Sequence, residues 1–182
     1  FGLVILVFYA VDTGILTWSS VYLHDTLDAT KSVAPLAFAA YEAGAIVSRF
    51  GGDFLVRRRG AAFAVRLGAA IGITGLVGVV AAQSPPLAIA SFFVVGLGLA
   101  ILAPISLAAT AGAVGPAAVD VAIARLNIAN YLGAILGGGL IGAAASAHHL
   151  RWAFVIPLVI VPAVLFVAKA FRAADVAGST AQ

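Results

Sequence analysis

Residues 67–119 read LGAAIGITGLVGVVAAQSPPLAIASFFVVGLGLAILAPISLAATAGAVGPAAV, and this stretch decides the class of fold because it contains no charged side chain. Its polar interruption is Gln83-Ser84-Pro85-Pro86, which divides it into two apolar runs. A helix of about 20 apolar residues is long enough to cross the hydrocarbon core of a bilayer. The stretch therefore predicts two membrane-spanning helices joined by a tight turn.

The composition of the whole chain points the same way. Of its 182 residues, 63% are hydrophobic and 9% are charged. Soluble domains contain about 45–50% apolar residues, and a chain of this size cannot enclose the excess in a core of its own. We therefore expect lipid to be the solvent for much of the surface, and the lipid bilayer to be a partner of the protein.

Continuous apolar runs of similar length occur along the rest of the chain, separated by short segments that hold most of the charges and prolines. They predict an all-α, polytopic membrane protein with a transmembrane unit over residues 1–171 and a polar tail over residues 172–182. Pro157 and Pro162 are expected to kink the last span. The six predicted spans are residues 1–23, 33–50, 61–82, 87–111, 121–144 and 152–171.

The lysines and arginines predict the orientation of these spans. Lys31 and Arg151 fall on one side of the predicted bilayer, and the other eight basic residues fall on the opposite side. Because basic residues are retained in the cytoplasm, this bias places both ends of the segment there and explains the net charge of +3 without nucleic acid as a partner. The eight are Arg49, Arg57, Arg58, Arg59, Arg66, Arg125, Lys169 and Arg172.

The chain contains no methionine, and it begins inside an apolar run. We therefore expect it to be part of a longer polypeptide. It also contains no cysteine, which excludes disulfides and thiolate chemistry from this segment.

Half of the basic residues surround a Gly-Gly-Asp sequence between the second and third predicted spans, in SRFGGDFLVRRRG at residues 48–60 and at Arg66. Small residues here allow neighbouring helices to approach, and Asp53 can neutralise a nearby arginine or meet a helix N-terminus. The stretch resembles the signature loop of the major facilitator superfamily. The resemblance implies a short loop that clasps one conformational state. Its matching residues are Arg49, Gly52, Asp53, Arg57, Arg59 and Gly60.

Three other segments resemble bacterial transporters of the fucose-permease-like branch of that superfamily. They are TWSSVYL at residues 17–23, GLGLA at 96–100 followed by Pro104, and the glycine-rich run at 132–142 followed by Leu150-Arg151. The resemblance implies the C-terminal half of a twelve-helix transporter in the bacterial inner membrane, built from two inverted three-helix repeats. The substrate site would then lie against a missing N-terminal six-helix half.

Two carboxylates fall inside predicted spans, where a charge requires a cavity or a partner. Asp12 lies near the middle of the first span and Glu42 near the middle of the second, and counting residues from their shared loop puts them at similar depth. We expect them to line one polar cavity and to carry a proton whose release is coupled to substrate binding. The alternatives are that Glu42 neutralises Arg49 and that Asp12 pairs across helices without a role in transport.

The fifth predicted span carries a polar face. Asn127, Asn130 and Tyr131 recur at helical spacing, and Gly133 and Gly137 form a small-xxx-small pair on the adjacent face. Amides and a phenol are suited to contacting a small polar solute. They are equally suited to hydrogen bonding between packed helices, so the sequence leaves both interpretations open.

These features favour a proton-coupled secondary transporter that works by alternating access, and the alternative is a non-transporting scaffold or a degenerate remnant. We expect no enzyme activity, because no nucleophile and base are paired at one depth, and no cofactor. Adjacent His148 and His149 diverge on a helix and have no third ligand in sight, so we expect no metal site.

Overall fold

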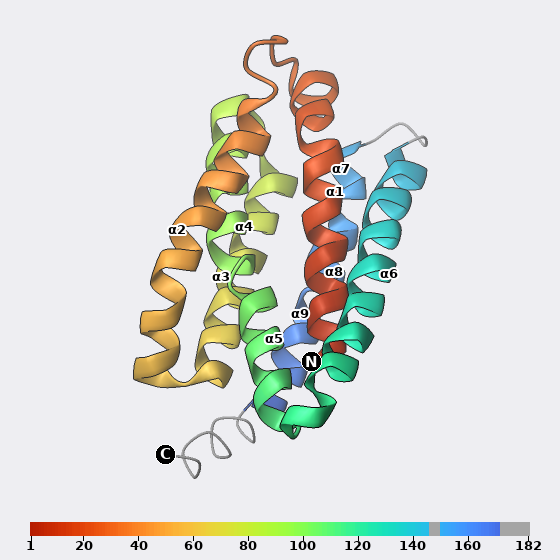
Figure 1. The fold of residues 1–182 in the computed structure, drawn as a ribbon. Helices are drawn as coiled ribbons and strands as arrows, with labels where there is room; N and C mark the ends of the chain where they lie inside the picture. The colour runs from red at the N-terminus through yellow and green to blue at the C-terminus, as the bar shows by residue number, and fades with distance from the viewer. Residues whose placement is uncertain (146–149, 172–182) are drawn as a thin grey trace.

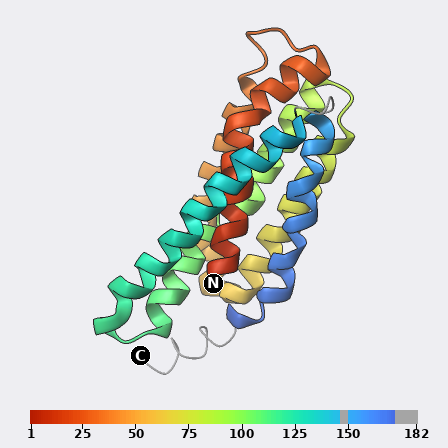
Figure 2. The same cartoon turned by 90° about the vertical axis from the view of Figure 1, so that its right-hand side faces the viewer.

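The computed structural model describes residues 1–145 and 150–171, and all regular elements in these ranges are helical. Long helices stand side by side, with α1 between α2 and α6 (Figure 1). The same bundle seen from the side shows α6 crossing α1 along most of its length (Figure 2). The elements are α1 (Gly2–Leu27), α2 (Leu36–Arg59), α3 (Ala61–Ala81), α4 (Pro85–Leu99), α5 (Leu102–Ala113), η1 (Pro116–Ala118), α6 (Val119–Ala145), α7 (Leu150–Ala153), α8 (Val155–Ile160) and α9 (Pro162–Val167).

Five helical segments in the described ranges are long and apolar enough to cross a membrane. They are Gly2–Leu27, Ala61–Ala81, Pro85–Ala113, Pro116–Ala145 and Leu150–Val167. The sixth long helix, α2, has sufficient length but carries charges along its second half. The all-helical fold predicted from the apolar runs is confirmed. The predicted tail at 172–182 lies outside the described residues.

The expected loop after the second span is the feature that the sequence predicted wrongly. Residues 51–59 continue α2 as regular helix, and the chain turns only at Gly60, whose φ is 83°. Leucine and arginine propagate a helix well, and arginines in its last turn interact favourably with the helix dipole. Glycine adopts positive φ at little cost, so Gly60 makes the turn into α3. The residues of the expected clasp therefore form the last turns of a helix.

Prolines interrupt two of the predicted spans. The span predicted at 87–111 is divided into α4 and α5 at Ala100–Ile101, because Pro104 has no N–H to bond the carbonyl of Ala100. The last span is divided in the same way into α7, α8 and α9. Its breaks fall at Phe154, three residues before Pro157, and at Val161, directly before Pro162. The kinks expected at these two prolines are therefore present.

Glycines determine which helices pack most closely. A Cβ added at Gly133 or Gly137 of α6 would meet the backbone of α1 at Leu6 and Ala10. Gly44 of α2 and Gly96 of α4 likewise face the backbone of each other's helix. Small residues that admit a neighbouring backbone are the usual basis of helix association in lipid, and the small-xxx-small pair in α6 has this role.

Two further contacts tie α1 to the bundle. The buried Tyr22 hydroxyl donates a hydrogen bond to the Val79 carbonyl of α3 at 2.7 Å, and its ring packs edge to face with Phe92 and Phe154. The indole N–H of Trp18 donates to the Gly138 carbonyl of α6 at 3.1 Å. These bonds satisfy polar groups that lipid would leave unpaired, and they fix α1 as the central helix of the bundle.

Candidate transport site

The first element of the site is a hydrogen bond between α1 and α2. The Tyr41 hydroxyl of α2 donates to Oδ1 of Asp12 in α1 at 2.5 Å. Tyr41 is buried and Asp12 is half-buried, so the phenol provides a fixed donor to a carboxylate that is partly shielded from solvent. Hydrogen bonds to an ionised carboxylate are short and strong, which accords with this geometry.

Glu42 follows Tyr41 in the chain, so the bond from Tyr41 to Asp12 places both carboxylates at one level, as residue counting predicted. Arg49 lies two helical turns beyond Glu42 in α2. Within the described ranges neither Glu42 nor Arg49 forms an ion pair or a side-chain hydrogen bond, so the two are not in direct contact. The alternative in which Glu42 neutralises Arg49 through a snorkelling side chain or water stays a prediction. The carboxylates of Asp12 and Glu42 thus lie at one level, with Arg49 further along α2. The Tyr41 hydroxyl is hydrogen-bonded only to Asp12.

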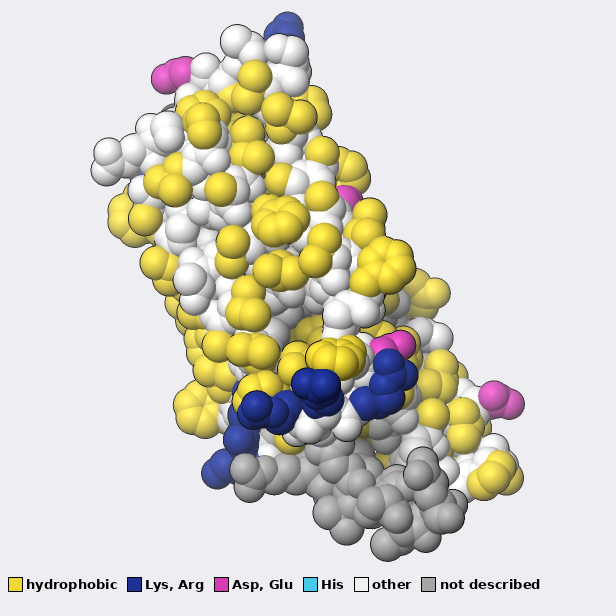
Figure 3. All heavy atoms as spheres, turned by 90° about the vertical axis from the view of Figure 1, so that its left-hand side faces the viewer, with side chains coloured by type: hydrophobic (Ala, Val, Ile, Leu, Met, Phe, Trp, Pro, Cys, Tyr) yellow, Lys and Arg dark blue, Asp and Glu magenta, His cyan; other side chains and the backbone are white. Residues whose placement is uncertain are grey.

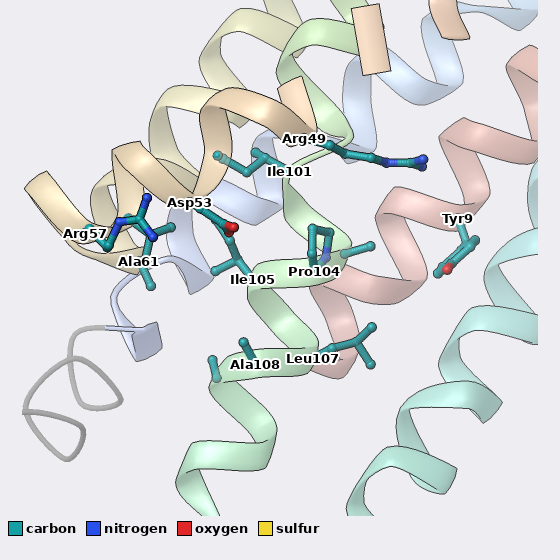
Figure 4. A pocket seen from close by; sticks show the side chains of 14 residues that line it. Tyr9, Arg49, Asp53, Arg57, Ala61, Ile101, Pro104, Ile105, Leu107 and Ala108 are labelled. Carbon is teal, nitrogen blue, oxygen red and sulfur yellow. The ribbon is translucent and has the colours of Figure 1, made fainter. Parts of the chain in front are cut away.

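A pocket of about 750 Å³ opens one helical turn below Asp12. Tyr9 projects into it from α1, while Arg49 and Asp53 extend from α2, and Pro104 and its neighbours in α5 form the apolar wall (Figure 4). Arg57 lies at its outer margin. Tyr9 and Asp12 are three residues apart and lie on the same side of α1, although Asp12 does not itself line the pocket.

The pocket gives the two glycines of the Gly-Gly-Asp sequence different surroundings. A Cβ on Gly52 would lie 3.0 Å from the Ile101 side chain at the α4–α5 break, whereas a Cβ on Gly51 would meet nothing within 4 Å. Asp53 forms no ion pair with any described residue, so the expected neutralisation of a nearby arginine is not seen within this segment. The close contact of this region is therefore between Gly52 and the α4–α5 break.

Enlarging these glycines should have opposite effects on stability. Gly52→Leu forces Ile101 to shift and should destabilise the native-length protein by about 1–3 kcal/mol. Gly51→Leu enters open space on the same helix and should be neutral or stabilise by up to about 1 kcal/mol, because leucine is the better helix former. Thermal unfolding in detergent measures both variants. Equal losses of stability would contradict the contact between Gly52 and Ile101.

The polar face of α6 lies beside α1 and is open. Asn127 and Tyr131 are exposed, Tyr131 to 68%, and Asn130 is half-buried. In the part of the chain that the structure describes, none of their side chains is hydrogen-bonded to a neighbouring helix. Hydrogen bonding of this face to the packed helices of the segment is therefore not observed, and contact with a polar solute stays a prediction.

Within the described ranges, no group of three or more His, Asp or Glu side chains is arranged to hold a metal ion. His148 and His149 lie outside the described residues.

The model of one protein family matches residues 1–182, and its description is Major Facilitator Superfamily. The chain belongs to the major facilitator superfamily. Members of this superfamily carry small molecules across membranes, and the several long apolar helices of the described ranges agree with a multi-pass membrane protein.

Two relatives are named as uncharacterised transporters. One, y4wD of Sinorhizobium fredii (strain NBRC 101917 / NGR234), is 34% identical over 142 residues, which are 78% of this chain and 37% of that protein. The other, an MFS-type transporter of Yersinia pestis, is 27% identical over 154 residues, which are 84% of this chain and 40% of that protein. The chain thus spans about two fifths of the length of these relatives.

A crystal structure of the peptide transporter POT, a mutant in complex with sulfate, has the same fold over 96% of this chain and 38% of its own. The TM-score is 0.81 and the sequence identity is 20%, so the likeness concerns the fold.

Proposed function

We propose that this segment is the six-helix half of a secondary active transporter that moves a small polar solute by alternating access, coupled to protons at Asp12 and Glu42. The observation that carries the proposal is the hydrogen bond from buried Tyr41 to Asp12, beside Glu42. An ionisable group at this depth in a membrane helix is energetically costly, and such groups commonly mark substrate or proton pathways. The Asp12 carboxylate accepts a hydrogen bond from the phenol of another helix, and it can release this bond when it takes up a proton.

Two inverted three-helix repeats, α1–α3 and α4–α9, are part of the proposal. The first helix of the first repeat, α1, packs against α6 of the second repeat. The first helix of the second repeat, α4, packs against α2 of the first repeat. Such reciprocal pairing is expected for repeats related by a pseudo-two-fold axis in the membrane plane. We place both ends of the segment in the cytoplasm of a bacterial cell, on the side of Arg57, Arg58 and Arg59.

The partner of the open face is proposed to be a further six-helix half, in the same chain or in a second one. The exposed Asn127 and Tyr131 of α6 and the half-buried Asp12 of α1 would then line the cavity between the two halves. This chain aligns with only 37% and 40% of the two relatives, which supports a functional unit longer than this segment. The Gly52–Ile101 contact beside Asp53 would stabilise one of the alternating states.

The experiment for this function uses everted membrane vesicles that contain the native-length protein and hold a pH gradient. Sugars and other small polar solutes are added singly, and a fluorescent amine reports the gradient. A coupled solute should change the gradient in these vesicles, by lowering it in exchange or by raising it in symport, but not in vesicles without the protein. Solute flux that leaves the gradient unchanged would contradict proton coupling, and normal expression without flux of any solute would favour the scaffold.

Removing the Tyr41 hydroxyl tests its hydrogen bond to Asp12 without removing the buried ring. Tyr41→Phe keeps the buried ring but removes a charge-assisted hydrogen bond of about 1.5–3 kcal/mol, so we expect coupled transport to fall about tenfold or more. Initial rates over a range of external pH give the measurement, because a proton-binding role should also shift the pH profile.

Tyr22→Phe is the matched control, since it removes an equally buried phenol that donates to a carbonyl away from Asp12. It should lower stability and leave the pH profile of transport unchanged. If the two variants have the same transport and the same pH profile, Tyr41 has only a structural role.

A further inference from the structure

We propose that the α2–α3 hairpin binds the headgroup of an anionic phospholipid through Arg58 and Arg59, which are held in place by the rings of Phe54 and Phe63. Arg58 and Arg59 do not line the transport pocket, and the proposal is independent of the transport mechanism. Its residues lie on the outer face of the hairpin, where basic side chains adjoin a broad apolar surface (Figure 3).

The two arginines are fixed by aromatic rings instead of carboxylates. The guanidinium carbon of Arg58 lies 4.5 Å from the centroid of the Phe54 ring, and that of Arg59 lies 5.5 Å from the centroid of the Phe63 ring. A guanidinium over a ring keeps its N–H edges available for hydrogen bonding while losing side-chain freedom. Both groups are therefore oriented to receive an acceptor.

The charge of the hairpin is not balanced within the described chain. Arg57 and Arg66 add two further cations, and none of the four arginines forms an ion pair with a described residue. Asp53, the acidic residue of the same helix end, lines the pocket on the side of α5. Guanidinium groups without carboxylate partners, as at Arg58 and Arg59, are complementary to a phosphate, which accepts several charge-assisted hydrogen bonds.

The apolar surface next to the arginines selects a lipid as the occupant. Val47, Phe50 and Phe54 recur at helical spacing above Arg58, and they are exposed to 51%, 84% and 54%. This stripe is suited to acyl chains, and the arginines at its end lie where a headgroup would be. A soluble phosphate would use only the basic end, and an acidic protein segment would leave the stripe uncovered.

The test is the affinity of the native-length protein for phosphatidylglycerol relative to phosphatidylcholine, measured by native mass spectrometry of lipid-titrated detergent micelles. For the Arg58→Gln/Arg59→Gln variant we expect affinity for phosphatidylglycerol about 30-fold weaker, which is about 2 kcal/mol at 1.4 kcal/mol per tenfold. Affinity for phosphatidylcholine should remain unchanged.

The matched control is Lys31→Gln/Arg125→Gln, which removes the same charge from two residues outside the hairpin. It should retain the affinity of the wild-type protein for phosphatidylglycerol. Equal losses in the two double variants would mean that binding follows net charge, and they would overturn the site. Equal affinity of the wild-type protein for both lipids would also overturn it, as expected if the hairpin binds an acidic protein segment instead.

Arginines also determine the orientation of membrane proteins, so removing two of them can disturb insertion into the membrane. A second variant that retains the charge avoids this problem. Arg58→Lys/Arg59→Lys retains the charge but loses the planar group that stacks on the rings. We expect its affinity for phosphatidylglycerol to be at least threefold weaker than that of the wild-type protein. Unchanged affinity would contradict binding by ring-held guanidinium groups.

Discussion

Asp12→Asn should abolish proton-coupled solute movement, with initial rates at least about a hundredfold lower than those of the wild-type protein. The amide still accepts the hydrogen bond from Tyr41, so the helix packing between α1 and α2 remains. It cannot take up a proton, and a missing essential proton-transfer group typically costs two to four orders of magnitude. Everted vesicles with an imposed pH gradient give the rate of coupled movement directly.

Glu42→Gln tests whether the second carboxylate has the same role. The Glu42 side chain has no hydrogen-bond partner in the described chain, although it lies at the level of Asp12. We expect a smaller loss, together with a shift of the pH profile, because one of two neighbouring negative charges is removed. If transport survives both amide variants unchanged, coupling at this pair is refuted.

The largest effect on stability is expected for Gly137→Leu in α6. A Cβ at this position would lie 2.8 Å from the Cα of Ala10, so the added side chain meets the backbone of α1 and forces the two helices apart. Overpacking usually costs about 1–3 kcal/mol, and a clash with backbone belongs at the upper end. We expect Tm of the native-length protein to fall by roughly 5–10 °C.

Gly139→Leu provides the comparison for this prediction, because a Cβ at Gly139 meets nothing within 4 Å. The helix, the substitution and the depth are nearly the same, and only the contact with α1 differs. Gly139→Leu should leave Tm within about 2 °C of the wild-type value. Comparable losses in both variants would show that α6 tolerates neither side chain for reasons unrelated to α1.

Local signals predicted much of this architecture. Uncharged runs indicated the helices, and the spacing of Gly133 and Gly137 indicated a packing face, because both signals reside in consecutive residues of one helix. Counting along two helices from their shared loop also placed Asp12 level with Glu42. The break before Pro104 was predictable in the same way from its missing N–H, although the sequence interpretation treated that span as continuous.

Other features depend on tertiary contacts. Gly51-Gly52-Asp53 has the composition of a turn, yet the surrounding helix-forming residues extend α2 through it, and Gly52 faces Ile101. Tyr41 was missed because a tyrosine in an apolar span is ordinarily a packing residue. The sequence could indicate only that the Tyr41 hydroxyl, if buried, requires a hydrogen-bond acceptor. The packing of α1 against α2 shows that this acceptor is Asp12.

The central claim is that the polar face of α6 borders a cavity that opens alternately to the two sides of the membrane. The most direct measurement is the labelling of a Tyr131→Cys variant by a membrane-impermeant maleimide in right-side-out and in everted vesicles. This chain has no cysteine, and any cysteine elsewhere in the native-length protein is first replaced by serine. The account predicts labelling from both sides, with a ratio that responds to the pH gradient in the wild-type background and loses this response in Asp12→Asn. Labelling from one side alone, whatever the gradient, would contradict it.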